Sequence, residues 1–179
     1  MTDGDSSGAG DLIFIEPAAG FEIRVVSPSE RVAVEALIAG GAAEEMAGAM
    51  LTALADIPDT QVFGGFQRGE LVAVYCLRRD GMANDLALIV VAPQRRMRGI
   101  GRSLLQDALR RSGKRPLAAQ TPEVVLPFFR ACGFQLVGRR AQPSGEVWFR
   151  VGWHAPGAHF KGGTTNALTH RGLDTSTES

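Results

Sequence analysis

Residues 90–105 read VVAPQRRMRGIGRSLL, and this stretch decides the fold class. An apolar run ends at Ala92-Pro93, glycines follow at positions 99 and 101, and an amphipathic helix begins immediately after them. The first turn of a helix has N–H groups without intrahelical partners and partial positive charge, so such a helix start binds phosphate. The glycines let a pyrophosphate approach the backbone closely. Nearby positive charge comes from Arg95, Arg96, Arg98 and Arg102.

Outward from this stretch, strand-like and helix-like segments follow one another along the chain. Two-residue alternation or continuous apolar runs predict strands over residues 21–26, 61–66, 71–78, 86–91, 116–120, 134–139 and 146–152. Helix signals cover residues 29–38, 42–55, 99–112 and 122–132, where Pro127 either kinks the last helix or marks its first turn. The nearly continuous apolar run at 86–91 predicts a central strand covered on both faces. This order predicts an α+β fold with a mixed central sheet of six to seven strands flanked by about four helices.

Composition excludes several classes of protein. The 19 Lys and Arg residues balance 19 Asp and Glu residues, so net charge draws the chain to neither nucleic acid nor membrane. Cys76 and Cys132 lie far apart in apolar contexts, which predicts reduced core residues. We expect a cytoplasmic protein with one domain over residues 21–153. Residues 1–20 read as a flexible leader with a short edge strand, and residues 154–179 as a polar tail.

Two motifs resemble one known family. The segment Arg96-Met97-Arg98-Gly99-Ile100-Gly101 is similar to the Gln/Arg-x-x-Gly-x-Gly/Ala signature of the GNAT (GCN5-related) N-acetyltransferases. Downstream, the segment FFRACGF at 128–134 resembles the aromatic-aromatic-x-x-x-Gly-Phe segment of the same family. The resemblance covers about residues 21–153, and it implies the GNAT acyl-CoA acyltransferase fold with acetyl-CoA as co-substrate. The histidines lack metal-ligand spacing and two cysteines are too few for a zinc site, so we expect no metal.

The resemblance also assigns residues to the co-substrate. It implies that Ile89, Val90 and Val91 pair their backbone with the pantetheine arm. It implies that the pyrophosphate is held by the loop backbone of Met97, Arg98, Gly99, Ile100, Gly101 and Arg102. In the family this strand diverges from the next one and forms a V-shaped cleft for the thioester.

Candidates for proton transfer are few. Many GNAT enzymes protonate the leaving thiolate with a tyrosine, but the matching position here is Phe129, and the only tyrosine, Tyr75, lies in an earlier strand. Asp85 precedes Arg96 by eleven residues, where related enzymes place a glutamate base; it is read either as that base or as a polar turn residue. Glu44 and Glu45 are read either as receptors for a cationic amine or as surface charges of the 42–55 helix.

These observations lead to two function hypotheses. The first is an acetyl-CoA-dependent N-acetyltransferase that acts by direct transfer to an amine on a small molecule or a protein. The second is an acyl-CoA-binding GNAT module without efficient turnover, which the phenylalanine at 129 favours. The arginine cluster also suits a nucleic-acid-binding module, but interleaved aromatic residues are missing. We expect no nucleic-acid or membrane partner, and we keep a homodimer open.

Overall fold

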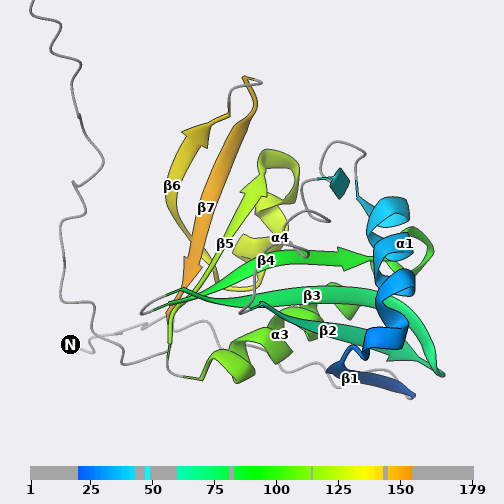
Figure 1. The fold of residues 1–179 in the computed structure, drawn as a ribbon. Coiled ribbons are helices and arrows are strands. Elements are labelled where there is room, and N and C mark those ends of the chain that lie inside the picture. Colours follow the sequence, from blue (N-terminus) through cyan, green and yellow to red (C-terminus); the bar gives the residue numbers. More distant parts are fainter. Residues whose placement is uncertain are drawn as a thin grey trace, which may run out of the picture.

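The computed structural model describes residues 20–42, 47–48, 60–80, 83–113, 115–142 and 145–154. Within them, seven strands form one mixed sheet in the order β1-β2-β3-β4-β5-β7-β6 (Figure 1). The strands are β1 (Phe21–Val25), β2 (Thr60–Gln67), β3 (Glu70–Asp80), β4 (Ala83–Val91), β5 (Leu117–Pro122), β6 (Gln135–Ala141) and β7 (Val147–Trp153). The helices are α1 (Arg31–Gly41), α3 (Ile100–Ser112) and α4 (Leu126–Ala131). The predicted α+β fold with a mixed sheet is confirmed.

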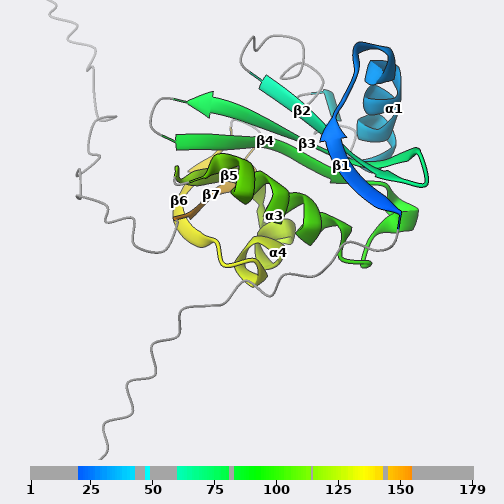
Figure 2. The same cartoon turned by 90° about the horizontal axis from the view of Figure 1, so that it is seen from below.

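Helices cover the sheet on both faces. The view in Figure 2 places α1 on one side of the strands and α3 and α4 on the other. The core on the α3 side includes Phe63, Tyr75 and Leu104. The core on the α1 side includes Val34 and Ile38. β1 to β4 are antiparallel, β4 and β5 are parallel, and β5, β7 and β6 are antiparallel.

β4 is the central strand, and the alternation of its side chains between the two faces of the sheet is interrupted part-way along. Its ladder with β3 shifts register, because Cys76 pairs with Leu88 while Leu77 pairs with Leu86. Ala87 is therefore an extra residue on β4, which is a β-bulge. As a result Leu86 packs in the α3-side core, but Leu88 packs in the α1-side core although the two leucines are only two positions apart. The expected coverage of this strand on both faces is confirmed.

The helix boundaries follow local signals, with two differences from expectation. Ser27 and Glu30 form a capping box at a 3₁₀ turn over Pro28–Glu30, which leads directly into α1. The helix predicted over residues 29–38 ends later than expected, because Gly40 and Gly41 both belong to the last turn of α1. Pro127 lies in the first turn of α4, where its missing N–H costs no helical hydrogen bond.

Some sequence predictions fall outside the described residues. They include most of the helix expected over 42–55, of which Ala47 and Gly48 are described and helical. They also include residues 1–19 and 155–179.

Candidate functional site

The most distinctive feature of the sheet is the divergence of β4 from β5. The two strands pair only where residues 84–86 lie beside residues 117–119. Beyond that point β5 continues to Pro122 against β7, and β4 continues to Val91 against β3. The bulge at Ala87 falls where the pairing stops, and bulges bend a strand. Figure 1 shows the arrowheads of β4 and β5 pointing apart.

The divergence leaves one edge of β4 open. The Ala92 N–H donates to the Val72 carbonyl at 2.9 Å, which fixes the phase of the β3–β4 ladder. Because hydrogen-bonded and non-hydrogen-bonded pairs alternate in an antiparallel ladder, Val90 turns its N–H and C=O towards β3. Ile89 and Val91 turn theirs the other way, towards the open edge. An extended ligand could pair with this edge as an added strand would.

The open edge leads to the glycine-containing loop and the start of α3. Met97 and Gly99 have positive φ angles of 58° and 78°, and Gly99 is the N-cap residue of α3. The first helical hydrogen bond runs from the Ser103 N–H to the Gly99 carbonyl at 3.0 Å. The N–H groups of the three residues between them therefore precede the helical ladder and are oriented to receive an anion.

The two glycines of the loop serve different purposes. A Cβ added at Gly99 would meet no atom within 4 Å, so its left-handed backbone is what favours glycine there. Gly101 has a helical backbone, and a Cβ there would lie 3.4 Å from the Phe128 ring and 3.8 Å from Val91. Because Gly101 has no side chain, nothing projects at this position between the start of α3 and the open edge of β4.

The arginines around the loop mostly bind the protein itself. Arg96 Nε donates to the Val91 carbonyl at 3.1 Å, and its NH2 group donates to the Gly41 carbonyl at the end of α1. Arg95 pairs with Glu70 at 3.1 Å, and Arg102 donates to the Ala131 carbonyl at 3.1 Å.

Arg98 is exposed, and no described residue forms a hydrogen bond or ion pair with its side chain. The sequence suggested that all four arginines add positive charge near the helix start. Three of the four guanidinium groups instead join loop, strand and helices.

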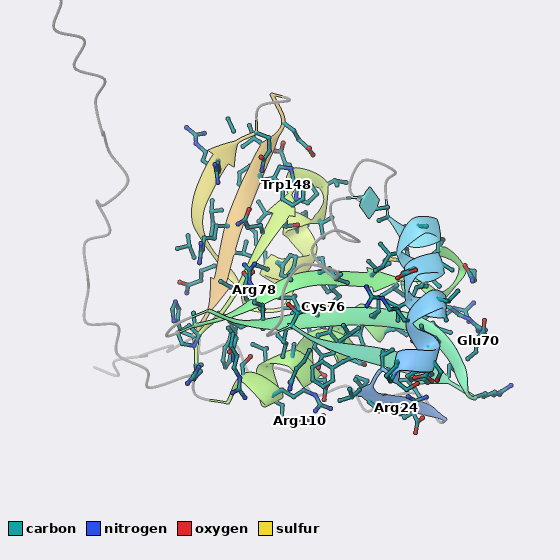
Figure 3. The ribbon with its side chains drawn as sticks, in the orientation of Figure 1. Arg24, Glu70, Cys76, Arg78, Arg110 and Trp148 are labelled. Carbon is teal, nitrogen blue, oxygen red and sulfur yellow. The ribbon has the colours of Figure 1, made fainter. Side chains whose placement is uncertain are left out.

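Asp85 lies at the closed end of the divergence. It pairs with Ala118 across β4–β5, and its carboxylate accepts a hydrogen bond from Arg78 NH2 at 2.6 Å. Figure 3 labels Arg78 near the point where the strands converge. The Asp85 side chain is 18% exposed, so solvent still reaches it. The arginine stabilises the charged carboxylate. Glu44 and Glu45 lie outside the described residues.

Neither Phe129, at the position of the family's tyrosine, nor Tyr75 is exposed. Phe129 is buried, with its ring centroid 5.3 Å from those of Phe128 and Phe134. Tyr75 is also buried, and its hydroxyl donates to Asp107 Oδ2 at 2.5 Å. Burial and this hydrogen bond raise the pKa of Tyr75 far above its usual value.

The site thus combines an open strand edge with a helix start whose first N–H groups lie outside the helical ladder. The acetyltransferase (GNAT) domain model matches residues 58–136, which include β2 to α4 and this whole arrangement. This part of the chain matches the GNAT acetyltransferase family. The family resemblance of the two sequence motifs is confirmed.

Solved structures agree with this assignment at the level of the fold. A protein from Desulfovibrio desulfuricans described as a GNAT-family acetyltransferase is 20% identical, with a TM-score of 0.64, covering 75% of this chain and 98% of that one. A GNAT acetyltransferase from Elizabethkingia anophelis with acetyl-CoA bound is 16% identical, with a TM-score of 0.62 and coverage of 77% and 100%. The ribosomal-protein-S18-alanine N-acetyltransferase from Escherichia coli is 17% identical, with a TM-score of 0.60 and coverage of 78% and 99%. No curated protein matches the chain in sequence.

Within the described residues, no cluster of three or more His, Cys, Asp and Glu side chains could hold a metal ion. No helix in those ranges has both the length and the apolar character needed to cross a membrane. Cys76 and Cys132 are buried free thiols, as expected, and burial raises the pKa of Cys76 to about 12. The feature that sequence reasoning did not supply is the bulge at Ala87, which has no signal in an apolar run of similar residues.

Proposed function

We propose that this protein transfers the acetyl group of acetyl-CoA directly to an amine. The observation that carries the proposal is the continuous path from the open edge of β4 to the start of α3. The backbone of Ile89 and the N–H of Val91 suit the amide-rich pantetheine arm, while Arg96 already donates to the Val91 carbonyl. The N–H groups at the start of α3 suit the pyrophosphate. The acetyl-CoA complex of the Elizabethkingia anophelis protein, which has the same fold, supports this choice of co-substrate.

In the proposed reaction the amine nitrogen attacks the thioester carbonyl carbon. The carbon–sulfur bond breaks, CoA leaves as a thiolate, and the nitrogen loses a proton. Asp85 is the proposed acceptor of that proton, directly or through one water, because it lies where the strands begin to diverge. Arg78 holds the Asp85 carboxylate in place, and part of the Asp85 side chain remains exposed to solvent. Water protonates the thiolate in this scheme.

A second candidate function is binding of acyl-CoA without efficient turnover. Its specific support is that Phe129 occupies the position of the family's tyrosine and is buried in the α3-side core. Tyr75 is buried in the same core and donates its hydroxyl to Asp107, which lies on α3.

Two measurements test these proposals. Acetyl-CoA and CoA should raise the melting temperature of the purified protein, because a ligand that binds only the folded state stabilises it. Release of CoA thiol with a panel of amines then separates an enzyme from a binding module. Absence of a thermal shift and of calorimetric binding at millimolar CoA would refute both candidates, whereas binding without thiol release would favour the second.

A further inference from the structure

The three strands beyond the cleft present one set of side chains on the α1 side of the sheet. Val151 of β7 packs in the core on the α3 side, so its neighbour Arg150 points to the α1 side. The alternation places Trp148 on the same side. Across the ladders, Arg150 pairs with Gln120 of β5 and Gly138 of β6, and Trp148 pairs with Arg140 of β6. We call Gln120, Arg140, Trp148 and Arg150 the β5–β7–β6 face.

This face is open and positively charged. Arg140, Arg150 and Gln120 are exposed, and Trp148 is half-buried. No described residue forms a hydrogen bond or ion pair with Arg140 or Arg150. Gly138 has no side chain beside Arg150, and a Cβ there would meet nothing within 4 Å. Within the described residues these two guanidinium groups are therefore not held as those of Arg95, Arg96 and Arg102 are.

The β5–β7–β6 face adjoins the closed end of the cleft. Ala118 pairs with Asp85 on one side and with Gly152 on the other, and Gln120 lies two residues further along β5. Two residues of a strand span about 7 Å, which is within the reach of an arginine side chain. On the opposite side of the sheet α4 packs against β6, whereas α1 packs mainly against β3 and β4, so the α1 side of β5, β7 and β6 is the more accessible to an acceptor. Figure 3 shows Trp148 near the end of β5, beside the opening between β4 and β5.

The charges on this side favour an anionic group. Asp85 is already paired with Arg78, and Glu146 is an exposed residue that precedes β7. Arg140 and Arg150 thus leave positive charge beside the reaction centre. A guanidinium group binds a planar carboxylate through two parallel hydrogen bonds, a geometry that a simple polyamine cannot use.

We propose that the β5–β7–β6 face binds the acceptor and selects an amine that carries a carboxylate, with Arg150 pairing with that carboxylate. Trp148 supplies an apolar surface for the rest of the acceptor. The inference rests on the proposed acetyl transfer, and it names the acceptor class. It differs from the expectation that Glu44 or Glu45 receives a cationic amine.

The test compares ligands that differ only in the carboxylate. N-acetyl amino acids and their amides are titrated by calorimetry into the CoA-saturated protein, and the free amino acids and amides are compared as substrates by kcat/KM. We expect at least one acid to be favoured over its amide by about tenfold or more in both measurements. Arg150→Gln should remove that preference. Arg139→Gln is the matched control, because Arg139 is an exposed arginine of the same hairpin that pairs with Phe149 on the other face.

Each outcome bears on the proposal. Equal binding of acids and amides, a preference for spermidine, or an unchanged preference in Arg150→Gln would overturn the acceptor class while CoA binding stands. Loss of the acid preference in Arg139→Gln as strong as in Arg150→Gln would overturn the assignment to this face. Failure of the protein to bind CoA would refute the proposed function and this inference together.

Discussion

Replacing Tyr75 with phenylalanine separates a structural from a catalytic role for the only tyrosine. In the structure its hydroxyl donates to buried Asp107, which also accepts hydrogen bonds from Arg110 and Arg111. The ring stacks on Phe63 with centroids 4.9 Å apart, and phenylalanine preserves that contact. Tyr75→Phe therefore removes one buried hydrogen bond and leaves an Asp107 oxygen with fewer partners. Such a loss costs about 1–3 kcal/mol.

The assay is thermal and urea unfolding, together with CoA affinity. For a chain of this size each kcal/mol lowers the melting temperature by about 2–4 °C, so we expect a decrease of about 2–12 °C. CoA affinity and turnover should change less than about twofold, because Tyr75 lies in the core on the α3 side. A double-mutant cycle with Asp107→Asn should give a coupling energy of about 0.5–3 kcal/mol.

The pH dependence of Tyr75→Phe has a defined sign. The pKa of Tyr75 is raised in the folded state, so its stabilising contribution is complete below the unfolded pKa of about 10 and is lost as pH rises above it. The stability difference between wild type and Tyr75→Phe should be constant from pH 6 to 9 and shrink at higher pH. Unchanged stability combined with lost turnover would refute this reasoning and make Tyr75 the missing acid.

The remaining predictions concern the loop, the proposed base and the first helix. Gly101→Val should keep the fold but weaken CoA binding by about tenfold or more in calorimetry, because the valine methyl groups cover the helix start. Gly40→Ala, in open space on α1, is the control. Equal CoA affinities of the two variants would contradict the loop assignment. Asp85→Asn should lower turnover by roughly a hundredfold at neutral pH, with partial recovery at high pH and nearly unchanged CoA affinity, and wild-type rates across that range would exclude the base. A hydrogen bond from Arg24, aided by Ser27, lowers the pKa of Glu30 to about 2. The stability difference between wild type and E30Q should therefore be largest above pH 4.5 and vanish as pH falls towards 2. A difference that does not depend on pH in urea unfolding would contradict the ion pair.

The arginines of the loop have partners that their positions in the sequence do not indicate. Its composition suggested four charges directed at phosphate, yet Arg96 reaches Gly41, which is 55 residues away in the chain. A Cβ on Gly41 would come within 2.6 Å of the Val90 side chain, so α1 approaches β4 closely at this point. Positive charge at the end of α1 also stabilises the helix dipole. Arg96 thereby joins α1 to the end of β4, beside the loop.

Local features of the chain were predictable from the sequence alone. The element order, the helix start after Gly99 and the hairpin turn at Arg68-Gly69 each depend on residues within a few positions of one another. Backbone preferences and hydrophobic periodicity are properties of such short segments, so they can be predicted without knowing which other segments pack against them. The two motifs that identify the family belong to this local class.

The arrangement of the site was decided by tertiary structure. The bulge at Ala87 exists only in relation to the register of β3, and the open edge of β4 exists because β5 pairs with β7 instead. Phe129 is a core residue because Phe128 and Phe134 pack around it, and Arg150 joins Trp148 on one face only through strand alternation. Register, strand divergence and side-chain partners are set by contacts between segments distant in sequence, and no local pattern encodes them.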